Sequence, residues 1–404
     1  MPDSRTVDAE RFAEGDLIEC APSSERQQVD MLRRREANLR GFLLGETHQD
    51  LVRASYQKAR SFMKIGRRVA EFDRGFAHGL PSYIIVCILT NNAWERDADL
   101  MDTEVVIRDC LGPPARVSRP TWSLPAGSWD THFHVLGPQN RFPFAANRKY
   151  TPPDASFEAC RSFHQALGIE RGFVVHANTH GFDNTVDLDA TARSEGQYLA
   201  VVRLDGTATP ESCRALHRAG ARGVRFAFNP QHGGTLDRAV FDHVLHCIGD
   251  LGWFVELHFA GSALPELESW IASIPIPVVI DHFGRIDPRH GLYDPSFEVL
   301  VSLAGRDNIW VKISGADRIS HQGQPYTDVV PFAHRLVAVA PERLLWGSDW
   351  PHTGYFDAGR FPDAGKLLDA FAAFVPEERV RTAILVDNPL RLLGEATIPP
   401  LCLD

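Results

Sequence analysis

The stretch WDTHFHV (residues 129–135) is the first of a series of short apolar segments that alternate with helical segments, and this alternation indicates the fold of the chain. Seven further strand candidates follow it, at residues 172–177, 198–204, 223–228, 253–259, 277–282, 308–314 and 343–349. Helical patterns lie between them, at residues 157–167, 211–219, 236–251, 264–274, 297–304 and 329–339. Such alternation predicts parallel βαβ units, and eight units over ~250 residues match the usual barrel size. We therefore predict an α/β protein with a (β/α)8 TIM barrel over residues 129–396.

A doubly wound open sheet is the competing fold for the same alternation. That fold usually carries a glycine-rich phosphate turn directly after its first strand. The sequence after residue 135 has no such turn. The closed barrel is therefore the preferred prediction.

A boundary precedes the barrel at residues 111–127, LGPPARVSRPTWSLPAG. Its four prolines and two glycines cannot continue a helix or a central strand, which indicates a linker or a connection along the surface. Before it, residues 25–68 show helical spacing of apolar residues. We therefore expect residues 1–118 to form an N-terminal, mainly helical extension of unknown role.

Composition excludes several classes of partner. The chain has 404 residues and a formal net charge of −10, so it offers no basic surface for nucleic acid or for an anionic membrane. Its longest apolar run, residues 83–89, is far shorter than the ~20 residues of a membrane span. The seven cysteines include no C-x-x-C pair, which favours reduced thiols. We expect a cytoplasmic protein and leave open whether it forms a homo-oligomer.

Two histidines end the first predicted strand. Side chains alternate along a strand, so His132 and His134 should point the same way, into the barrel. Branched apolar residues usually fill barrel interiors, and catalytic groups gather at the carboxyl ends of the strands. An H-x-H pair alone is a weak signal, so its weight depends on the other strands.

Three more polar side chains end strands on the same side. His258 ends the fifth strand, His282 the sixth and Asp349 the eighth. A lone histidine at such a position is most often hydrogen-bonded to a loop. Five polar groups at corresponding strand ends instead indicate an active site.

Two chemistries fit these residues, and the residues alone leave both open. In one, the histidines hold a divalent metal such as zinc, which lowers the pKa of bound water to ~7 while Asp349 takes the proton. In the other, the histidines donate hydrogen bonds to a carbonyl oxygen, and Asp349 is the general base for water.

Longer motifs carry a resemblance to a known family. The stretches DTHFHVLGP, RFPFAANRKYTPPDA, HGFDNTVDLDA, GARGVRF, VVIDHFGRID, WVKISGADR, WGSDWPH and DNPLRLLG span almost the whole barrel in order. They resemble the amidohydrolase-2 family, and within it the 2-pyrone-4,6-dicarboxylate lactonase branch. The resemblance implies a lactonase in which Asp349 activates water and His132, His134 and His282 polarise the ring carbonyl. It also implies that no cofactor is required, and it suggests a role in the catabolism of aromatic compounds.

The same resemblance implies which groups hold a small, carboxylated lactone. They are Tyr150, Asn178, Arg225 and Arg318, and an arginine fork suits a carboxylate because it binds both oxygens. His352, in the stretch after Asp349, would orient a site group or only stabilise the loop. Tyr150 could equally plug the barrel mouth, and a surface ion pair is an alternative for Arg318.

The sequence departs from the branch at two places. A second arginine expected after GVRF is missing from FNPQHGGT, and His258 replaces a tyrosine on the fifth strand. Both changes resemble relatives that act on sugar-acid lactones, including a galactarolactone isomerase. His258 also completes a set of ligands, with His132, His134 and Asp349, for a single zinc ion. The alternatives are therefore a sugar-acid lactonase or isomerase, a metal-dependent decarboxylase, or a binding module without activity.

Overall fold

A computed structural model describes residues 107–114, 116–229 and 234–394. Eight parallel strands follow one another around a single sheet in the order β1 to β8. They are β1 (Trp129–Phe133), β2 (Arg171–Val175), β3 (Tyr198–Val202), β4 (Ala221–Ala227), β5 (Phe254–His258), β6 (Val278–Ile280), β7 (Ile309–Lys312) and β8 (Leu344–Leu345). Each lies within or close to its predicted segment, so the prediction of a (β/α)8 barrel is confirmed.

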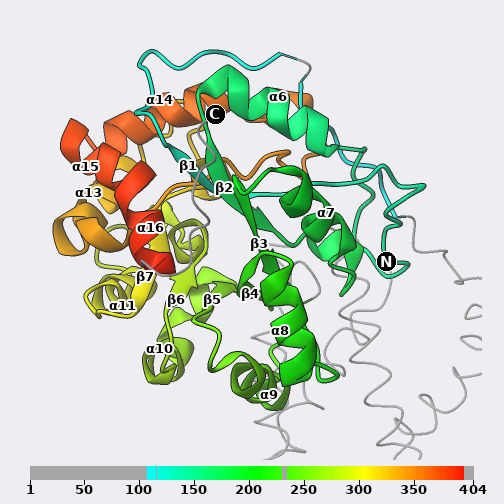
Figure 1. Ribbon diagram of the computed structural model, residues 1–404. Helices are drawn as coiled ribbons and strands as arrows, with labels where there is room; N and C mark the ends of the chain where they lie inside the picture. Colours follow the sequence, from blue (N-terminus) through cyan, green and yellow to red (C-terminus); the bar gives the residue numbers. More distant parts are fainter. Residues whose placement is uncertain (1–106, 115, 230–233, 395–404) are drawn as a thin grey trace, which may run out of the picture. The chain divides into compact units, whose positions relative to one another are not determined.

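Helices follow the strands and cover the outside of the sheet (Figure 1). They are α6 (Phe157–Leu167), α7 (Thr185–Arg193), α8 (Pro210–Arg218), α9 (Arg238–Ile248), α10 (Leu264–Ser273), α11 (Pro295–Ala304), α12 (Ala316–Ile319), α13 (Val330–Val339), α14 (Ala364–Phe374), α15 (Glu378–Thr382) and α16 (Asn388–Leu393). Local signals fix their ends. At α6, for example, the Ser156 side chain accepts a hydrogen bond from the Ala159 amide, and Gly168 ends the helix with φ 82°.

The barrel interior is layered. Large apolar side chains close the lower part, among them Trp129, Phe173, Phe254 and Trp310. Two residues further along β4, β5 and β7, the same inward face carries charged groups. This period of two places the chemistry above an apolar plug, at the carboxyl ends of the strands.

Strand β1 contains a bulge that matters for the site. Its pairing with β2 shifts between Asp130 and Phe133. Trp129 lies in the interior cluster, and Phe133 packs outside the sheet against His164 of α6. The shift therefore lets Trp129 and His132, three residues apart, both face the interior.

The barrel closes where the segment after β8 meets β1. The Thr131 amide donates to the Trp346 carbonyl at 3.0 Å, and the Asp349 amide donates to the His132 carbonyl at 2.8 Å. Gly347 makes this approach possible, because a Cβ there would lie 2.5 Å from Cβ of His132. Closure thus brings Asp349 directly beside the histidines of β1.

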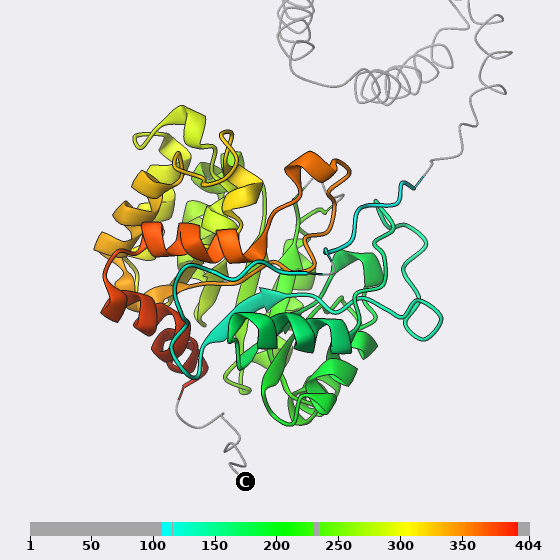
Figure 2. The ribbon, with the colours of Figure 1, turned by 90° about the horizontal axis from the view of Figure 1, so that it is seen from above.

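The described residues before β1 run across the outside of the barrel along α14 (Figure 2). The Thr121 amide donates to Asp369 at 2.6 Å, and the Trp122 indole donates to the Leu368 carbonyl at 3.1 Å. Residues 116–127 are thus a connection along the surface, as their prolines predict. The predicted extension lies, up to residue 106, outside the described residues, and so do its helical pattern and the apolar run 83–89.

Two smaller findings complete the fold. Within the ranges that the structure describes, no helix is both long and apolar enough to cross a membrane. The four described cysteines, Cys110, Cys160, Cys213 and Cys247, are buried free thiols.

Candidate active site

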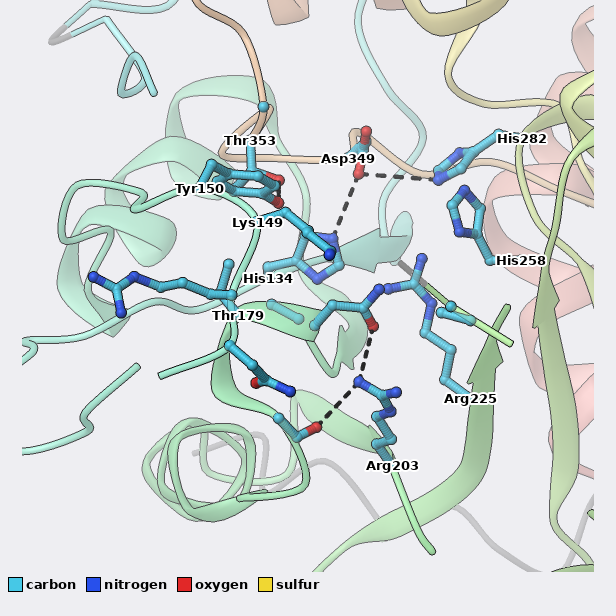
Figure 3. A pocket seen from close by; sticks show the side chains of 18 of the residues that line it. His134, Lys149, Tyr150, Thr179, Arg203, Arg225, His258, His282, Asp349 and Thr353 are labelled. Atoms are coloured by element: carbon cyan, nitrogen blue, oxygen red, sulfur yellow. Dashed lines mark hydrogen bonds and ion pairs between the residues drawn. The ribbon is translucent and has the colours of Figure 1, made fainter. Parts of the chain in front are cut away.

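A pocket of about 350 Å³ opens at the carboxyl ends of the strands. Figure 3 shows ten of its side chains by name. Eight predicted site residues line it: His134, Tyr150, Asn178, Arg225, His258, His282, Arg318 and Asp349. His132 lies just beneath them, fully buried and in ring contact with His134 and His282. His352 does not line the pocket; it is buried with its ring against Phe361.

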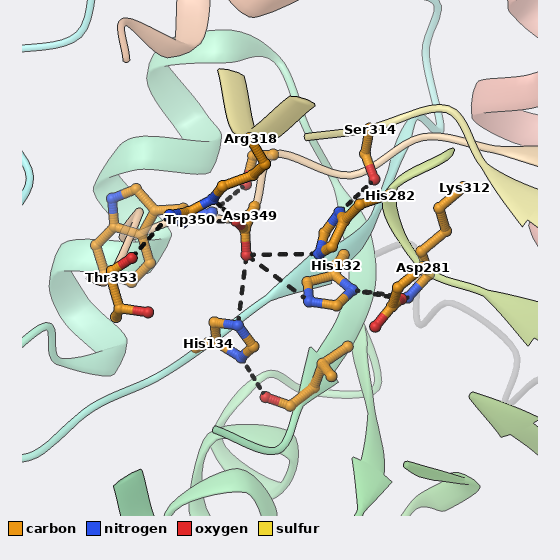
Figure 4. Close-up of polar contacts among 12 residues, drawn as sticks. His132, His134, Asp281, His282, Lys312, Ser314, Arg318, Asp349, Trp350 and Thr353 are labelled. Atoms are coloured by element: carbon orange, nitrogen blue, oxygen red, sulfur yellow. Dashed lines mark hydrogen bonds and ion pairs between the residues drawn. The ribbon is translucent and has the colours of Figure 1, made fainter. Parts of the chain in front are cut away.

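Asp349 is the centre of the site (Figure 4). Its Oδ1 lies 3.5 Å from Nε2 of His134, 3.8 Å from Nε2 of His132 and 4.0 Å from Nε2 of His282. Asp349 has φ 59° and His282 has φ 47°, a backbone region that residues other than glycine rarely occupy. Such strained residues cluster at functional sites, and here both turn a polar side chain toward the same point.

Arg318 holds the other oxygen of Asp349. Its Nε and Nη2 lie 2.8 Å and 2.7 Å from Oδ2, and its Nη1 donates to the Thr353 carbonyl at 2.9 Å. Burial alone would raise the pKa of Asp349, but the Arg318 guanidinium and the nearby histidines hold that pKa well below its ordinary value. Asp349 is therefore ionised at neutral pH, with Oδ1 available for chemistry.

The partners of two histidines bear on where their ring protons lie. Nδ1 of His134 lies 2.7 Å from the Val175 carbonyl, which can only accept, so Nδ1 carries the proton and the Nε2 of a neutral ring is an acceptor. Nδ1 of His132 lies 2.9 Å from Nζ of Lys312, which can donate to it, and 3.2 Å from Oδ1 of Asp281, which can accept from it. Nε2 of His132 faces Asp349 and has no hydrogen-bond partner among the described residues.

Burial keeps two of the histidines neutral. Burial and then the positive charge of Lys312 lower the pKa of His132 well below its ordinary value. Burial lowers the pKa of His282 to about 4, even though Asp349 acts in the opposite direction. Nδ1 of His282 lies 3.0 Å from the Ser314 hydroxyl, which can donate to it and leave the ring proton on Nε2.

A buried layer of charges supports the histidines from below. Lys312 of β7 donates to Glu256 of β5 and lies 3.3 Å from Oδ1 of Asp281. Arg225 of β4 pairs with the same two carboxylates, at 3.4 Å from Glu256 and 3.1 Å from Asp281. Burial and the charge of Asp281 raise the pKa of Glu256 to about 8. Arg225, expected as a substrate ligand, thus has much of its guanidinium held by the protein.

This layer is the part of the site that sequence reasoning missed. Glu256, Asp281 and Lys312 are not among the residues that the sequence predicts for the site. The available signal was their spacing, because Glu256 lies two residues before His258 on the same face of β5. Lys312 similarly lies two residues before Ser314, the hydrogen-bond partner of His282.

Among the described residues, two groups of side chains meet the distance requirement of a metal site, His132 with His134 and Asp349, and His132 with Asp281 and His282. His258 belongs to neither group. His134 would suit a metal, because its Nε2 can offer a lone pair. His132 fits as well, because its Nε2 has no hydrogen-bond partner in the described part of the chain and its Nδ1 can donate to Asp281, as a ligating histidine donates its other N–H to an acceptor. A divalent metal held by these residues would polarise a carbonyl oxygen or activate water.

The pocket is strongly cationic. Six cationic side chains line it, and Asp349 is the one carboxylate among its described lining residues. Arg225 and Arg318 have carboxylate partners. The remaining four, Arg148, Lys149, Arg203 and Arg285, form no ion pair with another residue of the described ranges. Unpaired cations around a cavity favour an anionic ligand.

The remaining predicted residues lie at the pocket wall. The Tyr150 hydroxyl donates to Thr353 at 2.7 Å, which joins the loop after β1 to the loop after β8. His258 ends β5, and its ring centroid lies 6.0 Å from that of His282. Burial and then the charge of Arg225 lower the pKa of His258 well below its ordinary value. Asn178 opens the short helix η1 (Asn178–His180) after β2.

The fold and this site define a family. Residues 129–394 match the family described as Amidohydrolase, and the chain belongs to it. Membership of this family makes the chain an enzyme of the hydrolase class, as the motifs predicted.

Particular relatives narrow the comparison. The chain is 50% identical over 287 residues to 4-sulfomuconolactone hydrolase of Hydrogenophaga intermedia, covering 71% of this chain and 95% of the relative. It is 38% identical over 287 residues to a 2-pyrone-4,6-dicarboxylate hydrolase of Comamonas testosteroni, covering 69% and 93%. It is 31% identical over 272 residues to D-galactarolactone isomerase of Agrobacterium fabrum, covering 67% and 92%.

A solved structure has the same fold. The crystal structure of a putative 2-pyrone-4,6-dicarboxylic acid hydrolase from Pseudomonas putida superposes with a TM-score of 0.59 at 33% identity. The match covers 67% of this chain and 98% of that protein. The predicted resemblance to this family is therefore confirmed.

Proposed function

We propose that this enzyme hydrolyses the ring ester of a lactone that carries a carboxylate and a second acidic group, with 4-sulfomuconolactone as the first candidate. The observation that carries the proposal is the Asp349 carboxylate, with Oδ1 facing three histidine Nε2 atoms, beside a pocket lined by six cationic side chains. The relative with 50% identity supports this choice, because it is named for 4-sulfomuconolactone, a lactone that carries a sulfonate and a carboxylate.

In the proposed reaction, Asp349 is the general base. Its Oδ1 accepts a proton from water while the water oxygen bonds to the ester carbonyl carbon. The ring C–O bond then breaks, and Asp349 returns the proton to the leaving ring oxygen. The product is an open chain with one hydroxyl and one new carboxylic acid, which keeps the second hydrogen of the water until it ionises and releases a proton to the solvent.

The histidines have different roles in this proposal. His132 and His282 donate from Nε2 to the carbonyl oxygen and stabilise the negative charge that develops there, an effect worth ~10²–10³-fold per donor. Nε2 of His134 accepts a hydrogen bond from the second O–H of the attacking water, because the ring proton of His134 is on Nδ1 and is donated to the Val175 carbonyl. Since the pKa of Asp349 is low, it is a weak base, and the polarised carbonyl must supply much of the acceleration.

Arg285 would bind an acidic substituent close to the ester. It follows His282 by three residues, lines the pocket and makes no ion pair with a described residue. Burial, and then the charge of Arg318, lower the pKa of Arg285, which indicates a cation that lacks a compensating anion. A substrate carboxylate would supply that anion.

Two alternatives keep the same site. The relative with 38% identity favours 2-pyrone-4,6-dicarboxylate, which also carries acidic groups. The relative with 31% identity favours isomerisation, in which a substrate hydroxyl replaces water as the nucleophile. Hydrolysis releases a new carboxylic acid, and isomerisation releases none, so base consumption separates the two reactions.

The test uses the purified full chain with 4-sulfomuconolactone, with 2-pyrone-4,6-dicarboxylate and with an uncharged γ-lactone, and it follows base uptake and ultraviolet absorbance. We expect turnover of the first substrate with at least one base consumed per ring, unchanged after chelation. Asp349→Asn should lower kcat by at least ~10²-fold without lowering the melting temperature. Asp307→Asn, at an exposed position, is the matched control and should behave as wild type.

Each other outcome has a definite meaning. Full activity of Asp349→Asn would refute the general-base mechanism. Loss of activity after chelation, restored by zinc, would refute hydrolysis without a metal. Turnover of the uncharged lactone alone would refute the acidic substrate.

A further inference from the structure

The pocket contains a group of hydrogen-bond donors that the proposed hydrolysis does not use. It is formed by Lys149, Asn178, Thr179 and Arg203, which lie at the carboxyl ends of β1, β2 and β3. The proposed catalytic groups come from β1 and from the segments after β6 and β8. Because the strands follow one another in order around the barrel, Asn178, Thr179 and Arg203, after β2 and β3, occupy the sector across from His282 and Arg318, after β6 and β7.

Arg203 is the principal cation of this sector. It directly follows β3 and is half-buried, with its guanidinium over the Phe182 ring at 4.4 Å. Its Nη1 makes only long hydrogen bonds, at 3.3 Å to the Gly181 carbonyl and 3.4 Å to Oδ1 of Asn178. No carboxylate of the described residues pairs with it. Burial and then the charge of Arg225 lower the pKa of Arg203, as expected for a cation without a counter-charge.

Three neutral or flexible donors accompany Arg203. Oδ1 of Asn178 accepts from Arg203, which leaves its amide donors without a partner in the described part of the chain. Thr179 is 2% exposed, and its hydroxyl is a buried polar atom with no hydrogen-bond partner among the described residues. Such atoms are costly to bury unless a ligand satisfies them. Lys149 is exposed, forms no ion pair with a described residue and points its amine into the pocket (Figure 3).

We propose that Lys149, Asn178, Thr179 and Arg203 form a second anion subsite, which binds the acidic substituent of the substrate that Arg285 does not bind. The inference rests on the proposed lactone hydrolysis and adds to it the group that distinguishes doubly from singly charged lactones. A sulfonate suits the subsite, because its three oxygens accept hydrogen bonds from several directions at once. A carboxylate would use the same donors.

The subsite acts on binding rather than on the chemical step. It does not contact the ester, so it holds the substrate and the transition state equally, and its loss should raise KM and leave kcat nearly unchanged. Hydrogen bonds to a charged group contribute enough for a change of about 10- to 100-fold in affinity.

The first experiment needs no turnover. Isothermal titration calorimetry compares binding of 3-sulfobenzoate, which has two charges, with binding of benzoate, which has one. We expect the full chain to prefer 3-sulfobenzoate by about 10-fold or more, and Arg203→Met and Lys149→Met each to reduce the preference to about 3-fold or less. Arg306→Met, at an exposed arginine outside the pocket, should keep the full preference.

The second experiment measures KM for 4-sulfomuconolactone and for muconolactone, which lacks the sulfonate. Arg203→Met should raise KM for the doubly charged lactone at least ten times more than KM for the singly charged one. If Arg203→Met fails to fold, Lys149→Met decides, because that exposed lysine has no packing role.

The outcomes separate this inference from the proposed function. A wild-type enzyme without preference for 3-sulfobenzoate, or variants that keep the preference, would overturn the subsite. A preference that disappears in both variants, in an enzyme that hydrolyses neither lactone, would support the subsite and refute the lactonase assignment.

Discussion

Asp349 and Arg318 show how one residue sets the properties of another. The guanidinium lies 2.7 Å from Oδ2 of Asp349, which is buried, and Arg318 itself is mostly buried. Without that cation, burial would act against ionisation of Asp349. Arg318 is therefore better described as the group that keeps the base ionised than as a substrate ligand.

The pH dependence of the reaction tests this pair. A general base works only when deprotonated, so activity is lost as the pH falls through its pKa. In the wild type this loss should occur below the ordinary pKa of an aspartate, 3.8. In Arg318→Met the largest favourable charge is gone, and the acidic limb of kcat/KM should move to higher pH by at least about one unit.

Arg318→Lys is the matched variant, because it keeps the charge and should leave the limb near its wild-type position. Profiles that coincide in all three proteins would show that Asp349 is not the group that titrates. Preincubation at each pH, followed by assay at pH 7, separates reversible titration from unfolding.

Among the elements, the junction of β1 with the segment after β8 controls the geometry of the site. A Cβ on Gly347 would lie 2.6 Å from the backbone nitrogen of His132, so the site has no room even for a methyl group. The backbone hydrogen bond from Asp349 to His132 crosses the same junction. A change at this glycine should therefore move the base relative to the histidines.

Gly347→Ala should lower the free energy of unfolding by about 1–3 kcal/mol, as overpacking does. It should also lower kcat by about 100-fold, because a displacement of ~1 Å between reacting groups has that effect. Gly206→Ala is the control, since a Cβ there meets only Val240 at 3.7 Å. Denaturant unfolding and initial rates measure both, and equal behaviour of the two variants would contradict the prediction.

The charged layer joins four strands, β4 to β7, in the same way. Lys312→Met removes the cation shared by Glu256 and Asp281 and leaves two buried carboxylates with one arginine. Breaking a buried ion pair typically costs about 3 kcal/mol or more, so we expect a loss of that size in denaturant unfolding. Lys366→Met, at an exposed lysine paired with Asp369, should cost under about 1 kcal/mol. Similar losses in the two variants would mean that the layer is not a stabilising network.

These elements also show what the sequence could and could not predict. Strand–helix alternation predicted all eight strands, since each is a short apolar run between turn signals. The positions of His132, His134, His282 and Asp349 followed from the rule that strand ends meet at one rim. Pairings across strands did not follow. Whether Arg225 faces a substrate or Asp281 depends on distances between β4 and β6 that no local pattern encodes.

At the scale of the whole molecule, the segment before β1 supports the pocket from outside. The Cys110 amide donates to the Thr151 carbonyl at 2.9 Å, and the Leu111 amide donates to the Tyr355 carbonyl at 2.7 Å. Tyr150 and Thr353, which are hydrogen-bonded to each other, lie on these two loops. The chain around residue 110 thus clamps two walls of the pocket, and residues 118–122 fix it to α14.

Truncation tests this support. We expect a chain that starts at residue 107 to keep kcat/KM within about 3-fold of the full chain, because every described site residue lies after that position. The match to the relative from Hydrogenophaga intermedia supports this, since it covers 95% of that protein and only 71% of this chain. A chain that starts at residue 129 loses the buried part of Trp122 and the clamp. We expect its melting temperature to fall by about 4 °C or more and its KM to rise.

Differential scanning calorimetry and steady-state kinetics compare the two truncated chains with the full one. Loss of the fold on removing residues 1–106 would show that the barrel depends on the N-terminal region. Identical behaviour of both truncated chains would show that residues 107–128 contribute nothing.

The layering of the barrel has a consequence for how such enzymes diversify. The buried charges form ion pairs between neighbouring strands, and the residues involved are Arg225, Glu256, Asp281 and Lys312. A single substitution in this layer leaves a buried charge without its partner, so a tolerated change requires several substitutions at once. Lys149 and Arg203 form no ion pair with a described residue, so their replacement leaves no buried charge without a partner. Selection for a new substrate can therefore replace the side chains of this rim one at a time while the reaction below stays the same. Enzymes with this barrel should therefore differ in substrate specificity mainly through residues of the pocket rim, while the catalytic residues stay the same.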